Sequence, residues 1–270
     1  MQESKRSKGV KHISYLEKDF IKASSSIWLL VGLVGAGKTT FAQKLWAASP
    51  KDTIRASLDE IIQMVSFYDY EPKMSSFYIG VERASIIDGL LNGYKVIVDR
   101  TNINRKVRGQ FISLVKDLRR ISRDYLKFYD GKDEDFFIER CESRLIENIL
   151  LEESRKKIDI YSSILKLVRN WRTKKRELEL FPKESSFIKE KLIELTKMEV
   201  VSIYFDVPAS LCIRRRLDDP QNILRDKVKK VDWKEVTKRM EKVFEIPDIK
   251  EDFDRIYRID HTGKVVGKIL

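Results

Sequence analysis

A short motif at residues 32–39 has the spacing of a phosphate-binding loop. It reads Gly-Leu-Val-Gly-Ala-Gly-Lys-Thr, with four residues between Gly32 and Gly37 and Lys-Thr directly after them. Glycines permit a tight turn in which backbone N–H groups converge on phosphate oxygens at the positive end of a helix. The alternative is a glycine-rich turn that binds nothing, but the apolar run before the motif and the lysine within it favour a nucleoside triphosphate site.

The two residues after the last glycine of the motif supply complementary chemistry. Lys38 would place a mobile positive charge between the β- and γ-phosphates, and Thr39 would supply a hydroxyl ligand for Mg²⁺. We therefore expect ATP, or another nucleoside triphosphate, and Mg²⁺ as cofactors. The expected nucleotide-binding residues are Gly32, Gly35, Ala36, Gly37, Lys38, Thr39 and Thr40.

Two aspartates further along the chain are candidates for the acceptor side of a transfer reaction. Asp59 follows a short β-like run, where a carboxylate can take the proton of an attacking hydroxyl. It is equally typical of a first-turn acid that complements a helix macrodipole. Asp99 ends an apolar, β-branched run and is a candidate for holding a Mg²⁺-bound water or the acceptor. Thr101 and Asn102 either bind the acceptor with it or form a turn that caps the next helix.

Three consecutive arginines, Arg214, Arg215 and Arg216, follow a β-like run and a proline. An arginine that a closing helix delivers can neutralise the charge that phosphoryl transfer places on the equatorial oxygens. Successive helical positions lie about 100° apart, so only one or two of the three are expected to reach the phosphates. The alternative is a basic helix with a structural role only.

The elements that would position these residues alternate along the chain. Alternating strands and helices imply a parallel sheet with right-handed crossovers and with ligands at the carboxyl ends of its strands. Asn104 is predicted to cap a helix, and Asn92-Gly93 to end one. We expect an α/β, three-layer domain of the P-loop kinase type, with strands near residues 27–31, 53–57, 95–99, 200–206 and, as the last clear strand, 255–259.

A long helical segment interrupts this pattern. A minimal βαβ unit needs about 30 residues, so most of residues 117–198 is expected to be an insertion, with breaks near residues 129–133 and Pro182. Between Arg140 and Arg176 there are 11 Lys and Arg against five acids. The segment is either a solvated hairpin packed on the core or a nucleic-acid clamp, and an apolar stripe is predicted at Ile164, Leu165, Val168 and Trp171. The expected organisation is a basic N-terminal segment (1–24), a kinase-type domain (25–116 and 199–270) and a helical insertion (117–198).

Composition limits the classes of protein that remain. The formal charge of +12 favours a polyanionic partner, although a lysine-rich solvated surface or a thermophile's composition gives the same value. No run approaches the roughly 20 apolar residues of a membrane helix, so no membrane association is expected. Cys141 and Cys212 stand far apart and there are only two histidines. A zinc site or a disulfide framework is therefore not expected, and a reducing cytoplasm fits.

Together, these motifs resemble the polynucleotide 5′-hydroxyl kinase family of P-loop kinases. The resemblance covers roughly residues 27–116 and 199–260. It implies that Asp59 is the general base, that Lys38 and an arginine of 214–216 stabilise the transition state, and that Asp99 belongs to the acceptor site. The residues that carry it are Gly32–Thr39, Asp59, Asp99-x-Thr101-Asn102, Asp206-Val207-Pro208, Arg214–Arg216, Met240-Glu241-x-x-Phe244-Glu245-x-Pro247 and Asp252-Phe253-Asp254.

The chain departs from this family's pattern at two places. The family usually has an arginine three residues after the base, where this chain has Ile62, and the segment Leu217–Pro220 is unusual. The same scaffold resembles seryl-tRNA kinases and small-metabolite kinases. The expected function is transfer of the ATP γ-phosphate to a hydroxyl, foremost the 5′-OH of RNA or DNA. The alternatives are a kinase of aminoacyl-tRNA or a metabolite, and an NTPase or binding switch. Oligomerisation through the insertion is possible.

Overall fold

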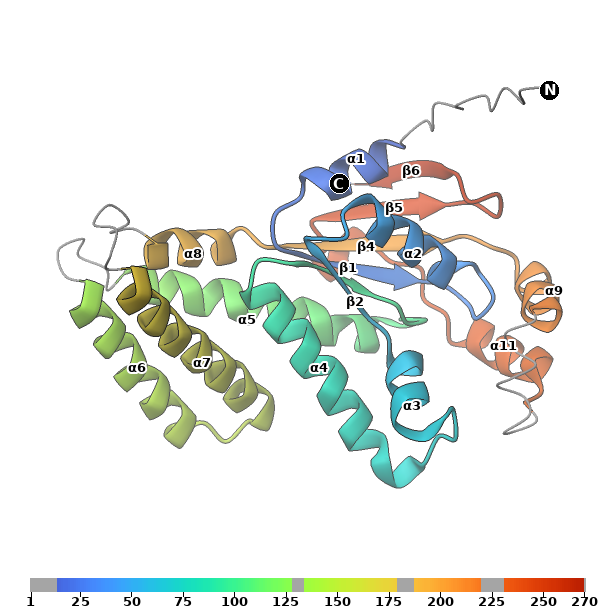
Figure 1. Cartoon of the computed structure of the whole chain (residues 1–270). Helices are drawn as coiled ribbons and strands as arrows, with labels where there is room; N and C mark the ends of the chain where they lie inside the picture. Colours follow the sequence, from blue (N-terminus) through green and yellow to red (C-terminus); the bar gives the residue numbers. More distant parts are fainter. Residues whose placement is uncertain (1–13, 128–133, 179–186, 220–230, 270) are drawn as a thin grey trace, which may run out of the picture.

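The computed structural model describes residues 14–127, 134–178, 187–219 and 231–269, which form a six-stranded sheet with helices on both faces (Figure 1). The strand order is β2-β3-β1-β4-β5-β6. All neighbours pair in parallel except β5 and β6. This confirms the expected α/β, P-loop kinase-type fold. The strands are β1 (Ser26–Val31), β2 (Thr53–Ala56), β3 (Lys95–Val98), β4 (Glu199–Phe205), β5 (Arg255–Ile259) and β6 (Val265–Ile269).

The central strand β1 shows why the core has two halves. All six of its residues are buried, as a strand covered on both faces must be. Because successive side chains point to opposite faces, Ile27 and Leu29 pack into one cluster and Trp28 and Leu30 into the other. The first cluster contains side chains of α4, α5, α6, α7 and α8, and the second those of α1, α2 and α9. The result is the three-layer arrangement.

The helices vary widely in length, and two of their ends follow the sequence predictions. Asn104 caps α5, with its Oδ1 accepting from the Val107 N–H at 3.0 Å, and α4 ends at Leu91, directly before Asn92-Gly93. The helices are α1 (Tyr15–Lys22), α2 (Lys38–Ala48), α3 (Leu58–Ser66), α4 (Ser75–Leu91), α5 (Arg105–Leu126), α6 (Glu134–Leu151), α7 (Arg155–Leu178), α8 (Phe187–Thr196), α9 (Ala209–Asp218) and α11 (Trp233–Lys242), with the 3₁₀ turns η1 (Pro72–Met74) and η2 (Ile249–Glu251).

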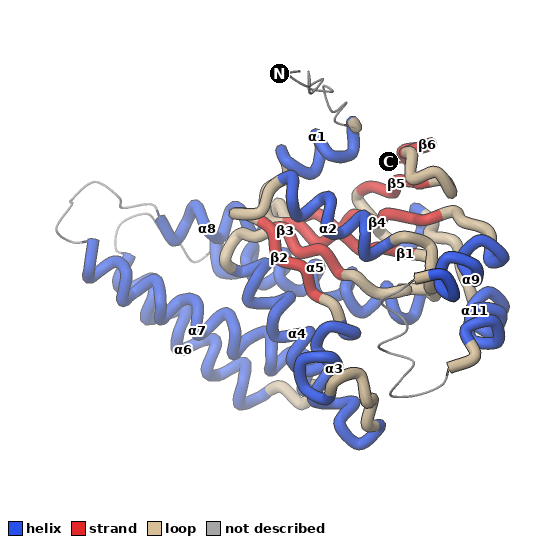
Figure 2. The backbone as a smooth tube through the Cα atoms, turned by 45° about the vertical axis from the view of Figure 1, so that its right-hand side comes forward, coloured by secondary structure: helices blue, strands red, loops and turns tan. Residues whose placement is uncertain are grey.

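The segment between β3 and β4 is helical, and α6 and α7 lie side by side at one end of the molecule (Figures 1 and 2). The predicted boundary at residues 116 and 117 falls inside α5, so one continuous helix belongs to both predicted parts. Ile164, Leu165 and Val168 are buried, as the apolar stripe requires. The expected breaks at 129–133 and Pro182, and the side chains of residues 171–178, lie outside the described part. The division into domains stays a prediction.

One strand, one helix and one break between helices were not expected from the sequence. Strand β6 adds an antiparallel edge, so 255–259 is not the last strand. Helix α1, which falls in the predicted basic N-terminal segment, is capped by a reciprocal Ser14–Glu17 box, and its Phe20 ring meets Trp28 edge-on at 5.0 Å. The helical insertion also breaks at residues 152–154, between α6 and α7. Both elements were missed because they are short: α1 has eight residues and β6 has five, which is too few for a clear hydrophobic period.

Candidate nucleotide-binding site

The phosphate-binding motif forms the turn between β1 and α2. Gly35 (φ +81°) and Gly37 (φ +96°) adopt the left-handed conformation that favours glycine, and α2 begins at Lys38. The Gly32 N–H donates to the Thr101 carbonyl at 3.0 Å, which ties the start of the loop to the segment after β3. Gly32 and Ala36 are buried in the frame of the loop rather than exposed in a cavity. The backbone therefore has the cradle shape that the motif predicts.

Gly35 also fixes where helix α9 sits. A Cβ atom at this position would lie 2.2 Å from the Cys212 carbonyl oxygen and 3.3 Å from the Arg216 Cβ atom. No side chain fits there, so the backbone of α9 packs directly against the loop. The spacing of the motif does not reveal this contact, because its partner stands more than 170 positions further along the sequence.

Lys38 is held inside the loop as a buried cation. Its side chain is almost fully buried, and its Nζ donates to the Leu33 carbonyl at 2.7 Å. Burial lowers the pKa of Lys38 to about 8, although the negative charges of Asp99 and Asp59 act to raise it. The positive charge of Arg216 lowers it further. These effects show that the two aspartates and Arg216 all lie within electrostatic reach of the lysine.

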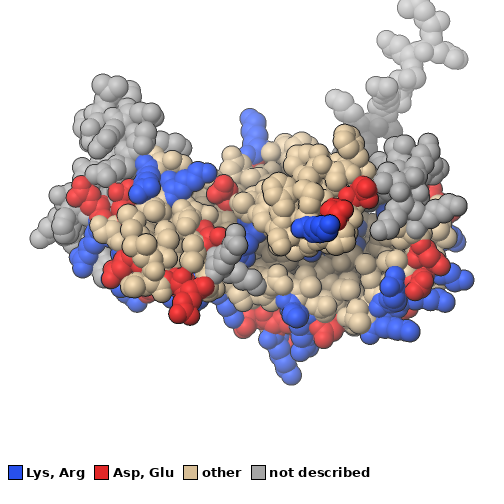
Figure 3. Space-filling model, turned by 90° about the horizontal axis from the view of Figure 1, so that it is seen from below, with Lys and Arg blue, Asp and Glu red and all other residues tan. Residues whose placement is uncertain are grey.

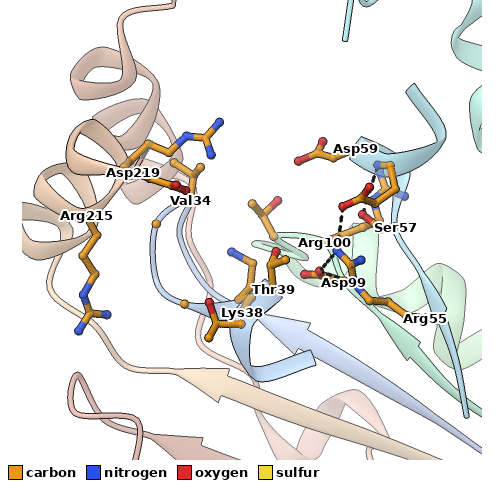
Figure 4. A pocket seen from close by; sticks show the side chains of 16 residues that line it. Val34, Lys38, Thr39, Arg55, Ser57, Asp59, Asp99, Arg100, Arg215 and Asp219 are labelled. Atoms are coloured by element: carbon orange, nitrogen blue, oxygen red, sulfur yellow. Dashed lines mark hydrogen bonds and ion pairs between the residues drawn. The ribbon is translucent and has the colours of Figure 1, made fainter. Parts of the chain in front are cut away.

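A cavity of about 280 Å³ opens over the loop (Figure 4). This volume is near the lower end of the range for small-molecule sites, so the cavity suits the phosphates and the reacting groups rather than a whole nucleotide. Its lining joins residues from four separate stretches of the chain. They are Val34, Gly35, Gly37, Lys38, Thr39, Thr40, Arg55, Ser57, Asp59, Glu60, Asp99, Arg100, Thr101, Arg215, Arg216 and Asp219.

Asp59 lies on the wall opposite the loop. It stands in the first turn of α3, where Ser57 caps the helix by accepting from the Glu60 N–H. Its side chain is exposed and projects into the cavity that Lys38 also lines (Figure 4). The first-turn position also matches the helix-dipole alternative, so the location alone is consistent with both readings. The structure does bring Asp59 to the site.

Asp99 lies in the same cavity but is already paired with an arginine that the sequence analysis did not single out. The Arg55 side chain on β2 donates to Asp99 Oδ2 at 2.7 and 3.0 Å, and it also lies 3.3 Å from Glu60. The Asp99 side chain is only 3% exposed, whereas that of Arg55 is 20% exposed. The sequence did carry a signal for Arg55, because it is the one charged residue in the short strand β2, whose carboxyl end reaches the site.

A second arginine that the sequence analysis did not single out, Arg100, lines the same wall. Its Nη1 lies 2.9 Å from Glu82 Oε2, and the Glu82 side chain is almost fully buried on α4. Burial raises the pKa of Glu82, and the attraction of Arg100 opposes that rise. Each arginine of this wall thus has a buried carboxylate partner, which holds it in place at the cavity.

The structure separates the two residues that follow this wall. Thr101 lines the cavity, whereas Asn102 is 1% exposed and does not. The Asn102 Nδ2 donates to the Leu30 carbonyl at 2.9 Å, and its backbone is left-handed with φ +45°. Asn102 therefore forms the turn that the sequence offered as the alternative, and its expected contact with an acceptor is not supported by its position.

Of the three arginines on α9, the structure brings two to the cavity. Arg215 and Arg216 line it, whereas Arg214 is exposed elsewhere, as the 100° helical spacing requires. Arg215 donates to the His261 carbonyl at 2.6 Å. The Arg216 guanidinium stacks 3.9 Å from the Trp233 ring centroid on α11, a cation–π contact that orients it.

Comparison with known protein families matches part of the chain. A family model described as an AAA domain matches residues 27–122, which run from β1 into α5 and include the loop and the wall that carries Asp59 and Asp99. No curated protein matches the chain. In the described part of the chain, no helix is both long and apolar enough to cross a membrane. The matched residues and the loop geometry together assign a P-loop nucleotide-binding fold to this chain.

Proposed function

We propose that this protein is a kinase that transfers the γ-phosphate of ATP to a hydroxyl, with the 5′-OH of a nucleic acid as the acceptor. One observation carries the proposal: the Asp59 carboxylate projects into the cavity from the wall opposite the loop that carries Lys38 (Figure 4). A nucleotide switch needs only the phosphate loop and a metal-binding hydroxyl. A phosphotransferase also needs a proton acceptor on the opposite side, where the attacking hydroxyl must lie.

The loop residues suit a nucleotide with Mg²⁺. The turn at Gly37 leaves open the space that a Cβ would fill, since the nearest other atom is 4.0 Å from that position. Lys38 would hold the β- and γ-phosphates, and the exposed Thr39 hydroxyl in the cavity would hold Mg²⁺. When bound, the ion supplies positive charge to the phosphates. A single hydroxyl from the protein is enough, because Mg²⁺ keeps several waters and phosphate oxygens as ligands.

The chain's own groups then have distinct roles in an in-line transfer. Asp59 accepts the proton of the acceptor hydroxyl, whose oxygen forms the new bond to the γ-phosphorus while the bond to the bridging β-phosphate oxygen breaks. Lys38 and Arg216 stabilise the charge on the transferring group. The tight contact of α9 with Gly35 holds Arg216 at a fixed place relative to the loop, so little reorganisation is needed during the reaction.

The acceptor-side wall offers two arginines to a phosphorylated acceptor. Arg55 and Arg100 line it beside the acids Asp59, Glu60 and Asp99, and the position three residues after Asp59 is Ile62. An arginine has five N–H donors, so Arg55 can bind a phosphodiester of the acceptor while it keeps its ion pair with the buried Asp99. The net charge of +12 and the basic insertion agree with a polyanionic partner.

Transfer of label from γ-labelled ATP tests the proposal. We expect labelled product with 5′-OH oligonucleotides of RNA or DNA and none with the same oligonucleotides carrying a 5′-phosphate. If label is found only on aminoacyl-tRNA or a metabolite, the proposed acceptor is wrong but the proposed phosphoryl transfer is retained. Release of free phosphate alone, whatever acceptor is offered, would mean an NTPase or a switch and would refute the proposed function.

A further inference from the structure

The connection between α3 and α4 exposes a phenylalanine in an unusual backbone conformation. Phe67 ends α3 with φ +50° and ψ +40°, and its side chain is largely in solvent, with 83% of the residue exposed. Tyr68 follows with φ +70°. A helix end of this kind usually carries glycine, because a side chain is disfavoured in the left-handed region. Phe67 therefore gives the fold neither a preferred backbone nor buried apolar area.

The surroundings of Phe67 hold an apolar surface in place. Tyr78 on α4 is 1% exposed, and the rings of Tyr70 and Phe77 pack against it with centroids 5.9 and 6.3 Å away. We define the aromatic tip by its large exposed side chains, which are Met64 (71% exposed), Phe67 (83%), Tyr70 (42%) and Phe77 (52%). Figure 3 looks onto this end of the molecule, where uncharged side chains form a broad surface.

The charges beside the aromatic tip restrict what it can bind. Asp69 and Glu71 lie in the same connection and are exposed, with Lys73 as the neighbouring cation. This excess of negative charge repels phosphate groups. The flat face of a nucleobase is uncharged and stacks on aromatic side chains with little regard to sequence. The tip therefore favours a base over the backbone of a nucleic acid.

The aromatic tip is joined to the candidate site by a single helix. Asp59 stands in the first turn of α3 and Phe67 at its end, eight residues later, which is about 12 Å along the axis at 1.5 Å per residue. Stacked nucleotides rise about 3.4 Å each along one strand. A strand whose 5′ nucleotide lies at Asp59 and which follows α3 would thus bring its fourth or fifth base, three or four nucleotides beyond the first, to Phe67.

We propose that the aromatic tip is a stacking platform for an unpaired base about three or four nucleotides from the 5′ end of the acceptor strand. The inference rests on the proposed function and deepens it, because it assigns a single-stranded end to the acceptor. A base in a duplex is already stacked and paired, so it does not use the platform. A protein partner or a second copy of the chain at the same surface is an outcome that the test below distinguishes.

The test compares Phe67→Ala and Phe67→Gly with the wild-type protein. Trp46→Ala is the control, because Trp46 is another exposed aromatic residue (45%), and it lies on α2, in the layer on the other face of the sheet. Binding of labelled single-stranded 5′-OH oligonucleotides of two and of twelve residues is measured at several salt concentrations. Transfer from ATP to the same oligonucleotides is measured in parallel.

We expect both Phe67 variants to bind the twelve-residue oligonucleotide about 5- to 150-fold more weakly than wild type, because one base-stacking contact is lost. We expect no change for the dinucleotide, no change in Trp46→Ala and an unchanged salt slope, because no phosphate contact is removed. Phe67→Gly should not lower the melting temperature, since glycine relieves the left-handed strain. Loss of binding in that variant is then not loss of fold.

Several results would overturn the platform. They are equal affinity of wild type and Phe67 variants at both lengths, an equal loss at both lengths, or a flatter salt slope. A concentration-dependent rise in mass that Phe67→Ala abolishes would assign the surface to a second copy instead. Failure of the proposed function is seen separately: wild type would then transfer no phosphate to either oligonucleotide, while the binding comparison would still decide the platform.

Discussion

The buried Lys38 predicts that nucleotide binding takes up a proton in alkaline solution. With a pKa of about 8, the lysine is about nine-tenths protonated at pH 7 and about one-tenth protonated at pH 9. Triphosphate oxygens around it favour the charged form and return its pKa toward the ordinary value of 10.5. Binding at pH 9 should therefore take up about 0.9 proton, and the Kd for ATP should rise about tenfold between pH 7 and pH 9.

Titration calorimetry in buffers of different ionisation enthalpy measures this uptake directly. Lys38→Arg is the control, because arginine keeps its charge throughout this range. The variant should show no uptake at pH 9 and no weakening of binding between pH 7 and pH 9. Uptake near zero in the wild type, or the same uptake in Lys38→Arg, would refute the assignment of a buried, phosphate-facing lysine.

Two further predictions concern the contact of α9 with the loop. Gly35→Ala should lower the free energy of unfolding, measured by chemical denaturation, by about 2–4 kcal/mol, since it adds left-handed strain and a clash with the Cys212 carbonyl. The control Gly109→Ala should be neutral or stabilising, because its added Cβ would meet no atom within 4 Å beyond the neighbouring backbone of α5. Arg216→Ala should reduce turnover by about 10²–10³, whereas Arg214→Ala, outside the cavity, should leave it within about twofold; equal losses in steady-state assays would refute the distinction.

The features that sequence predicts well here are those fixed by neighbouring residues. The phosphate-binding loop, the Asn104 cap and the stop at Asn92-Gly93 each depend on residues a few positions apart. The buried parallel strands also follow from local composition, because a strand covered on both faces is apolar throughout. These local signals were sufficient for the fold class and for the loop, and the sequence also singled out Asp59, Asp99, Thr101, Arg215 and Arg216, which line the other walls of the cavity.

The features that were missed depend on pairs that are distant in the sequence. Arg55 and Asp99 are 44 residues apart and meet only because β2 and β3 are neighbours in the sheet. The alignment of α9 with Gly35 likewise needs the order of the strands. Asn102 was expected at the acceptor site, yet its amide binds the Leu30 carbonyl. Its residue type fits a turn and a ligand contact equally well, and only the three-dimensional position decides between them.

The most direct test of the central claim compares wild type with Asp59→Asn in transfer from γ-labelled ATP to a single-stranded 5′-OH oligonucleotide. Asparagine keeps the shape of the side chain but accepts no proton, so turnover should fall by about 10²–10⁴ while ATP affinity changes little. Asp59→Asn with wild-type turnover would contradict the account, and a loss confined to Asp99→Asn would transfer the role of base to Asp99.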